Sequence, residues 1–226
     1  MRQGFSIIVV FVVALIFPQI VQAQETTYLS NLGQASIGSV AAGSNSWLAA
    51  DIITGNNVSG YIFNSAQLAM SDASGNPNNF TVMLYSATTS TGVKPGSNLG
   101  TLAGSTNPST TGIYTYTDDS NIILSPNTDY FIVLTAGTAV TNGAYEWSLT
   151  DTYSYNSSSG WGVGSDEGII AFFLTSNNGS SWNADEGNIQ FAINATPIPE
   201  PSSEMLLGLG GILLLGFGRW KAKAVE

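Results

Sequence analysis

Three pairs of neighbouring acidic residues are the first candidates for chemistry in this chain: Asp118-Asp119, Asp166-Glu167 and Asp185-Glu186. Hydrolysis of a glycosidic bond needs two carboxyl groups facing each other across the substrate, about 5 to 9 Å apart. Adjacent residues on a strand point to opposite faces, so one pair cannot supply both groups. Two pairs brought together by the fold could, and a glycan-acting enzyme is the third function considered, after a structural protein and a carbohydrate-binding module. We interpret the pairs as solvated loop carboxylates and predict no catalytic residue and no enzyme activity.

Two residue types are missing, and their absence excludes other chemistry. The chain has no histidine and no cysteine. This removes Ser-His-Asp and Cys-His nucleophiles, Cys/His zinc sites, His-ligated haem, iron–sulfur clusters and disulfides. Its 226 residues carry 15 acidic and five basic side chains, a net charge of −10. Nucleic acid is therefore not expected as a partner, because neutralising phosphates requires clustered Lys and Arg.

Calcium is the one cofactor that the composition leaves open. Asp72–Asn76 places oxygen side chains as the start of an EF-hand loop would, but Pro77 stands where glycine is required and Met83 where a bidentate Glu is required. These two departures exclude an EF-hand. A different oxygen-ligand site that uses Asp185-Glu186 and Asn188 stays open, and otherwise we predict no metal and no cofactor.

Two tryptophans in turn-rich stretches are candidate ligand contacts. Trp161 lies between Gly160 and Gly162, and Trp182 follows two serines. An exposed indole ring could stack on a sugar, as in carbohydrate-binding modules, where a few polar groups set the orientation. The other interpretation, which we favour, is that both rings pack in the core or anchor loops, because a large apolar area usually goes to packing.

The elements that must position these residues lie in the segment 24–196, which has strand patterns throughout. Phe80–Tyr85 alternates, with its even-numbered residues on one face, whereas Thr128–Leu134 is a continuous run of β-formers typical of a strand buried on both faces. Further strands are predicted at 169–174 and 189–193, and weaker ones at 28–32, 47–53, 61–70, 99–103, 113–116, 121–124 and 145–149.

Turn-forming sequences separate these strand candidates, and no window has a sustained helical period. The turns are predicted at Gly75-Asn76-Pro77, Lys94-Pro95-Gly96, Ser125-Pro126-Asn127, Asn142-Gly143 and Asn178-Gly179. About ten short strands in roughly 170 residues predict an all-β fold, a single antiparallel β-sandwich of jelly-roll-like type, with a barrel as the alternative.

The N-terminal segment 1–23 has the pattern of a secretory signal peptide. Arg2 supplies a positive charge, an apolar run follows from Phe5 to Phe17, and small residues at Val21 and Ala23 match the positions that a signal peptidase reads. We predict cleavage after Ala23. An uncleaved anchor is the alternative, but the apolar run spans only about 20 Å as a helix against a hydrocarbon core of about 30 Å.

The C-terminal segment 197–226 has three parts in order. Pro199-Glu200-Pro201 ends the preceding fold, because proline fixes its own φ and disfavours helix at the residue before it. An apolar run, Met205–Gly218, predicts a transmembrane helix at about 202–220. A basic end follows, which would stay on the cytoplasmic side and stop transfer; its cations are Arg219, Lys221 and Lys223. A plain tail anchor is the alternative, but it does not explain the Pro-Glu-Pro.

This three-part C-terminus resembles the PEP-CTERM sorting signal of Gram-negative bacteria. In that family the tail is recognised by an exosortase, a membrane-embedded cysteine transpeptidase-like enzyme. The resemblance implies cleavage near Pro199-Glu200-Pro201, then release or transfer to the cell surface. Glu204 departs from the pattern, because a charge at the start of an apolar segment is costly. The implied partners are signal peptidase, an exosortase and, transiently, the inner membrane.

The middle of the chain is similar to a second pattern, the choice-of-anchor R domain found upstream of surface-anchoring signals. The stretches that carry the similarity are Leu84-Tyr85, Pro95–Leu102, Leu124–Leu134, Tyr145-Glu146-Trp147, Gly179–Trp182 and Ile189–Ile193. The similarity implies an all-β extracellular module without catalytic residues. It also implies that the Pro-Gly lies in a loop between two strands and that the Asn-Thr-Asp-Tyr turn leads into a core strand.

Together these patterns predict an exported, non-enzymatic protein of the cell surface or extracellular matrix. Segment 24–196 contains twelve acidic residues and one basic residue, Lys94, so the processed domain would carry a charge of about −11. Its predicted setting is an exopolysaccharide or biofilm matrix, and exopolysaccharide is a candidate partner. A carbohydrate-binding module of the cell surface is the alternative function.

Overall fold

The computed structural model describes residues 24–88, 93–166, 169–170 and 172–200. Gln24–Ile198 form one compact unit, which extends two residues beyond the predicted domain end at 196. The predicted signal peptide, transmembrane helix, Pro201 and the three stop-transfer cations lie outside the described residues. Within the described ranges, no helix is long and apolar enough to cross a membrane.

The described part of the chain is all-β with antiparallel pairing, which confirms the predicted fold class at this level. The strands are β1 (Thr26–Ser30), β2 (Gly38–Ala42), β3 (Trp47–Ile53), β4 (Tyr61–Gly75), β5 (Thr81–Thr88), β6 (Lys94–Thr101), β7 (Gly112–Thr117), β8 (Ile123–Leu124), β9 (Asp129–Thr135), β10 (Gly143–Thr150), β11 (Asn156–Ser157), β12 (Ser165–Asp166), β13 (Ile169–Ile170), β14 (Phe172–Ser176), β15 (Trp182–Glu186), β16 (Asn188–Ile189) and β17 (Phe191–Pro197). A 3-10 turn, η1 (Val140–Asn142), precedes β10.

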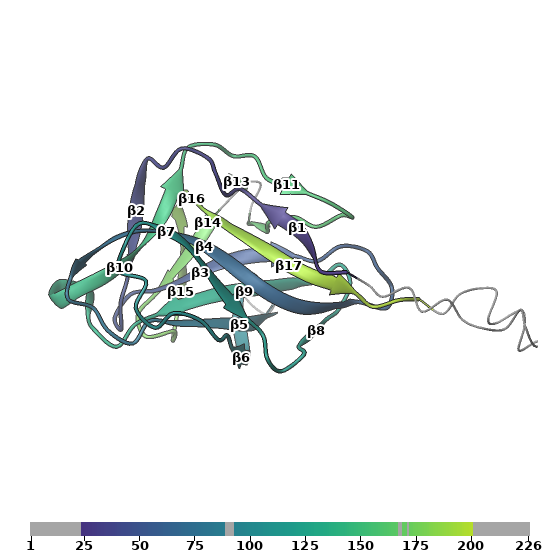
Figure 1. Cartoon of the computed structure of the whole chain (residues 1–226), viewed down its shortest axis with the longest axis horizontal. Coiled ribbons are helices and arrows are strands. Elements are labelled where there is room, and N and C mark those ends of the chain that lie inside the picture. The colour runs from purple at the N-terminus through teal and green to yellow at the C-terminus, as the bar shows by residue number, and fades with distance from the viewer. Residues whose placement is uncertain (1–23, 89–92, 167–168, 171, 201–226) are drawn as a thin grey trace, which may run out of the picture. The chain divides into compact units, whose positions relative to one another are not determined.

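The strands form two large sheets and one small one (Figure 1). The nine-stranded sheet has the order β11-β1-β17-β4-β10-β16, with β2 also paired to β10 and with β7 and β8 paired to β4. The six-stranded sheet has the order β15-β14-β3-β9-β5-β6, and β12 pairs with β13. Both large sheets contribute to one core, an arrangement consistent with a β-sandwich.

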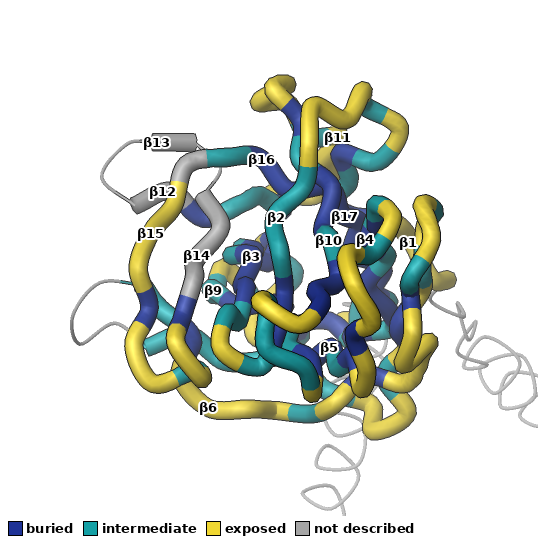
Figure 2. The backbone as a smooth tube through the Cα atoms, turned by 90° about the vertical axis from the view of Figure 1, so that its left-hand side faces the viewer, coloured by how far each residue is buried: buried dark blue, intermediate teal, exposed yellow. Residues whose placement is uncertain are grey.

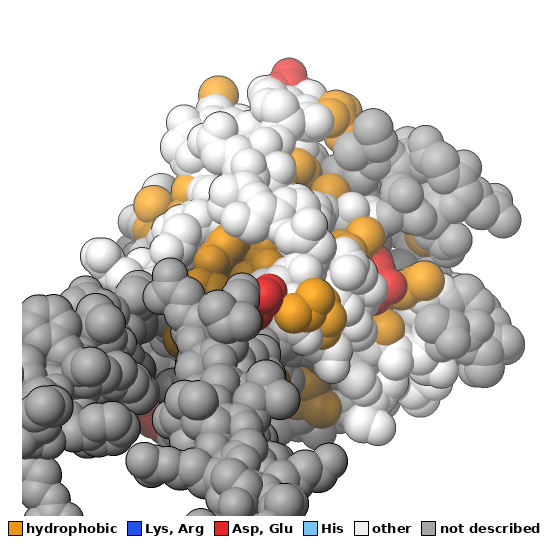
Figure 3. Space-filling view, turned by 90° about the vertical axis from the view of Figure 1, so that its right-hand side faces the viewer, with side chains coloured by type: hydrophobic (Ala, Val, Ile, Leu, Met, Phe, Trp, Pro, Cys, Tyr) orange, Lys and Arg blue, Asp and Glu red, His pale blue; other side chains and the backbone are white. Residues whose placement is uncertain are grey.

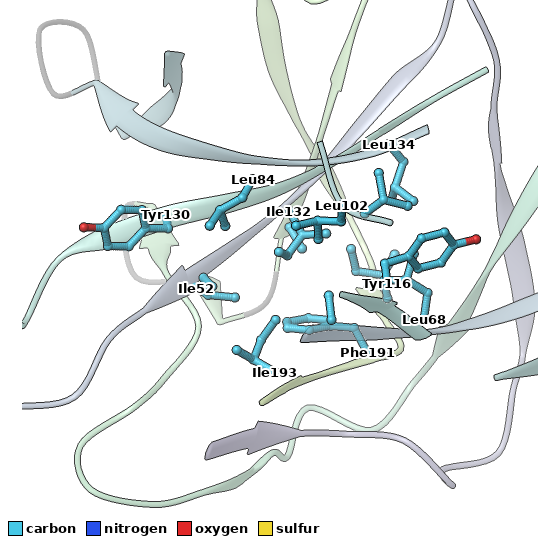
Figure 4. Close-up of a cluster of buried hydrophobic side chains, with 14 of the residues drawn as sticks. Ile52, Leu68, Leu84, Leu102, Tyr116, Tyr130, Ile132, Leu134, Phe191 and Ile193 are labelled. Carbon is cyan, nitrogen blue, oxygen red and sulfur yellow. The ribbon is translucent and has the colours of Figure 1, made fainter. Parts of the chain in front are cut away.

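The core lies between the inner faces of the two large sheets (Figure 4). Ile52, Leu84 and Ile132 enter it from the six-stranded sheet, and Leu68 and Phe191 enter it from the nine-stranded sheet. Figure 2 shows the buried residues along the central strands and the exposed residues in the connecting loops and on the edge strands β6 and β15. Burial of these apolar side chains is the main favourable term in folding.

A second, smaller cluster covers the outer face of the six-stranded sheet. Phe131 and Val133 of β9 are fully buried in it, whereas the neighbouring Tyr130, Ile132 and Leu134 belong to the main core. This confirms the prediction that the Thr128–Leu134 run is a strand buried on both faces. The alternation predicted for Phe80–Tyr85 is confirmed as well, because its even-numbered residues lie in the main core and the others do not.

The turn before β9 depends on a buried hydroxyl. Thr54 is fully buried, and its Oγ1 donates to the Ser125 carbonyl over 2.6 Å and accepts from the Thr128 amide over 2.9 Å. The Tyr130 hydroxyl accepts from the Ser125 amide over 2.9 Å. Asn127 adopts a left-handed φ of 48°, which asparagine tolerates. These bonds explain why the predicted Ser-Pro-Asn turn leads directly into a core strand.

The Pro95-Gly96 dipeptide differs from its implied position in a loop between strands. Both residues lie inside β6, and Pro95 faces Ala87 of β5. The register shifts between Tyr85 and Ala87 at this point. Because β6 is an edge strand and its ladder is irregular here, this is a position where strands tolerate proline.

Candidate functional site

Both candidate glycan-contact tryptophans are buried. Trp161 is 3% exposed and Trp182 is 7% exposed. The Trp161 ring stacks on Tyr28 with a centroid distance of 5.1 Å and meets Tyr61 edge-on at 5.0 Å. Trp182 packs in the smaller cluster beside Trp47. Stacking on a sugar requires an exposed ring face, so the burial of both rings argues against glycan contact through them and agrees with the packing interpretation.

Asp118, Asp119 and Asp185 are the members of the acidic pairs whose side-chain surroundings the structure describes. Asp118 accepts from the amides of Ser120 and Ile122, so its carboxylate stabilises the turn before β8. Asp119 and Asp185 are exposed. Glu167 lies outside the described residues. The sequence interpretation of Asp118-Asp119 as surface loop carboxylates is consistent with these positions.

Two of the residues considered as calcium ligands, Asp72 and Asn188, bond to other groups of the protein. Asp72 lies in β4 rather than in a loop, and its Oδ1 accepts from the Thr111 amide over 2.7 Å, which holds its pKa below the usual range. Asn188 is fully buried, with Oδ1 bonded to the Tyr155 hydroxyl and Nδ2 bonded to the Thr152 carbonyl, while Asp185 is exposed. No cluster of three or more acidic side chains that could hold a metal occurs among the described residues.

Asp129 has a partly buried carboxyl group whose effect on stability depends on pH. Burial of its carboxyl raises its pKa, and a bond to its own backbone amide opposes that effect in part. Folding therefore favours the protonated acid, so the stability contribution of Asp129 is fully present below pH 4 and is lost as the pH rises through the folded-state pKa. Asp129→Asn should therefore stabilise the domain at pH 7, which is seen as a higher melting temperature. The gain in the free energy of unfolding should be less than about 1 kcal/mol, because the group is half-buried.

The measurement is thermal unfolding of both proteins at pH 3 and at pH 7. The difference between them should shrink at pH 3, where the wild-type carboxyl is protonated. Asp119→Asn is the matched control, because Asp119 is exposed. Its replacement should change the melting temperature by the same small amount at pH 3 and at pH 7. An Asp129→Asn variant that is less stable than wild type at pH 7 would contradict the assignment.

The two ends of the domain are neighbouring strands, and this is the structural feature that bears on the terminal segments. β1, the first strand, pairs antiparallel with β17, the last strand, in the register Thr26↔Ala195 and Leu29↔Ile193. The start of β1 and the end of β17 therefore lie at the same end of the domain, on the right in Figure 1. Residue Gln24 and residue Ile198 leave the domain side by side.

Ile198, the last residue of the domain, is hydrogen-bonded to the turn between β3 and β4. The Ile198 amide donates to the Gly60 carbonyl over 3.0 Å. Asn57 Nδ2 donates to the Ile198 carbonyl over 3.0 Å and to the Gly60 carbonyl over 2.7 Å. Beyond this point Pro199 and Glu200 are exposed. We call Asn57, Gly60 and Ile198 the C-terminal junction.

Gly60 is required at this junction for two reasons. Its φ of +80° lies in the left-handed region, and a Cβ there would approach the Leu124 carbonyl oxygen to 2.4 Å. The Gly60 amide donates to the Asn57 carbonyl over 2.8 Å and closes the turn. Below the turn, Tyr61 pairs with Pro197 and packs edge-on against Tyr28 and Trp161, so the junction rests on a rigid aromatic cluster.

The role of Asn57 was not predicted from the sequence. The stretch from Gly55 to Gly60 has the composition of a turn. The hydrogen bond from Asn57 to Ile198, however, joins residues 141 positions apart. Only the pairing of β4 with β17 brings the two together.

The end of the domain that carries the junction has few charges. On the face drawn in Figure 3, hydrophobic side chains lie among neutral polar ones, a few Asp and Glu side chains are visible, and no Lys or Arg side chain is visible among the described residues. Val58 and Ile123, which flank the turn at Gly60, are 74% and 64% exposed. This surface differs from one built to bind nucleic acid, which would be basic.

Comparison with protein-family models, with curated proteins and with solved structures finds no match for this chain.

Proposed function

We propose that this chain is an exported surface or matrix protein whose two terminal segments are removed in turn. Signal peptidase would cut after Ala23, and an exosortase would recognise Pro199-Glu200-Pro201 and the apolar tail. The product is an acidic, non-enzymatic domain at the cell surface or in an exopolysaccharide matrix. The proposal includes the finer architecture, a jelly-roll-like sandwich of choice-of-anchor R type.

The pairing of β1 with β17 is the observation that carries this proposal. A precursor with an N-terminal and a C-terminal segment in the same membrane needs both ends of its domain to face that membrane. Gln24 and Ile198 leave the domain at one end, so both segments can enter the bilayer without unfolding the domain. Cuts outside Gln24–Ile198 leave the compact unit complete.

The composition of the domain supports a location outside the cell. The domain has no cysteine and a single basic residue, Lys94, and so needs no oxidative folding and carries a strong negative charge. Such a charge favours solubility and keeps the released domain away from anionic lipid surfaces. With Trp161 and Trp182 in packed surroundings, neither supports the carbohydrate-binding alternative.

Replacement of Pro199, Glu200 and Pro201 by alanine tests the sorting step. In a host that has an exosortase, wild-type protein outside the cell should lack residues 205–226, whereas the triple variant should stay in the membrane fraction with its tail attached. Intact-mass spectrometry of both fractions measures the result. The expected effect is near-complete loss of release.

The control for this experiment is Ser202→Ala with Ser203→Ala, which changes the adjacent tail and leaves the motif unchanged. It should be released as wild type is. If wild type and the triple variant both keep residues 205–226, the chain is a plain tail-anchored protein and the sorting proposal is wrong.

A further inference from the structure

We infer that Asn57 protects the last peptide bonds of the domain and thereby sets the first position at which the tail can be cut. The inference rests on the proposed function, because it concerns the site where the processing enzyme acts. It adds a residue far from the sorting motif in sequence, and it predicts that the released domain keeps Ile198 and at least Pro199.

The argument starts from what cleavage requires. An enzyme cysteine attacks the carbonyl carbon of the scissile peptide, and the developing oxyanion must accept hydrogen bonds from the enzyme. The C–N bond then breaks, the leaving amine takes a proton, and water or an acceptor amine resolves the thioester. The peptide must therefore offer a free carbonyl and a strand that can move into the enzyme.

The bonds before Pro199 do not meet this requirement. The Ile198 carbonyl already accepts from Asn57 Nδ2 over 3.0 Å, and the Ile198 amide donates to Gly60 over 3.0 Å. One residue earlier, Pro197 is paired with Tyr61 in the ladder of β17 and β4. Cutting at Pro197–Ile198 or at Ile198–Pro199 would need these contacts to open first.

The next bond, Pro199–Glu200, is the first beyond the junction. Both of its residues are exposed, and the segment lies outside the compact unit that ends at Ile198. Pro199 and Glu200, the first two residues of the motif, therefore follow directly on the hydrogen-bonded junction in the sequence. Asn57 is thus a positioning residue. It does not contact the bond that is cut, but its hydrogen bonds determine which peptide bonds the processing enzyme can reach.

Asn57→Asp is the most informative variant. Aspartate has nearly the same shape as asparagine but has no Nδ2 donor, and its carboxylate faces the Gly60 and Ile198 carbonyls, which repel it. The amide of Ile198 should exchange with solvent at least about tenfold faster, while the amide of Ile193, which lies in the centre of β17 and is fully buried, should keep its protection. Hydrogen exchange followed by mass spectrometry on the released domain measures both.

The cut itself is read from the C-terminal mass of the released domain. Wild type should end at Pro199 or later, and Asn57→Asp should give additional ends at Ile198 or earlier. Asn56→Ala is the matched control, because Asn56 is the exposed neighbour and should leave both the exchange and the terminus unchanged. A wild-type end before Pro199 overturns the inference, and so does an Asn57→Asp variant in which either readout stays as in wild type.

A second arm separates this inference from the sorting proposal. Detergent-solubilised full-length chain is digested briefly with proteinase K, which needs no sorting motif. Wild type should yield a domain that retains Ile198, and Asn57→Asp should lose it. If cells never remove the tail but this digest behaves as expected, the sorting proposal fails and the protection by Asn57 stands. Equal digestion of both proteins overturns the protection by Asn57.

Discussion

Trp147→Ala should lower the free energy of unfolding by about 3–5 kcal/mol, which is the range for truncating a large buried aromatic side chain. Trp147 is fully buried in β10, between Val40 of β2 and Met70 of β4. Its ring packs edge-on against Phe191, and its Nε1 donates to the Gln190 carbonyl over 2.9 Å. Truncation removes the packing and one of the two hydrogen bonds to the Gln190 carbonyl, which also accepts from the Ala69 amide over 3.1 Å.

Urea unfolding of the released domain, followed by circular dichroism, measures this loss. Ile113→Ala on β7 is the matched control, because Ile113 is 58% exposed and its truncation should change stability by less than about 0.5 kcal/mol. A Trp147→Ala loss below about 1 kcal/mol would mean that the ring does not pack in the core as the structure shows.

Asn31→Ala should lower the free energy of unfolding by about 2–6 kcal/mol, although it removes only a small polar side chain. Asn31 is 1% exposed and lies directly after β1. Its Oδ1 accepts from the Phe191 amide, and its Nδ2 donates to the Ile189 carbonyl, each over 2.8 Å. These two backbone groups flank Gln190, where the ladder passes from β16 to β17. Without the amide, both stay buried and unpaired, at about 1–3 kcal/mol each.

The same unfolding measurement tests this prediction. Asn183→Ala on β15 is the control, because that asparagine is exposed and should be nearly neutral. Asn31→Ala should also raise hydrogen exchange at Phe191. A variant as stable as wild type would show that the backbone groups find other partners when the amide is removed.

Period-two alternation was enough to predict the inner and outer faces of β5, because side chains on a strand alternate between its faces. It also predicted that β9 is buried on both faces, since its run of β-formers offers no polar face to solvent. The all-β class followed in the same way, from many short apolar runs separated by turn sequences.

Other elements could not be predicted, and the reasons differ. β2 (Gly38–Ala42) and β15 (Trp182–Glu186) have weak strand composition, and they are strands because β10 and β14 supply their hydrogen bonds. The sequence also predicted a single strand at Ile189–Ile193. The structure divides it at Gln190, whose carbonyl accepts from Trp147 Nε1.

The sequence by itself determined the fold class and the charge of the domain, because alternation, turn composition and residue counts are local properties. The three-part C-terminal pattern is likewise local and predicts a sorting signal without reference to the fold. Only the tertiary structure decided that Trp161 and Trp182 are buried, that β1 lies beside β17, and that Asn57 bonds to Ile198. Each depends on contacts between residues far apart in the chain, and no local pattern of residues specifies such contacts.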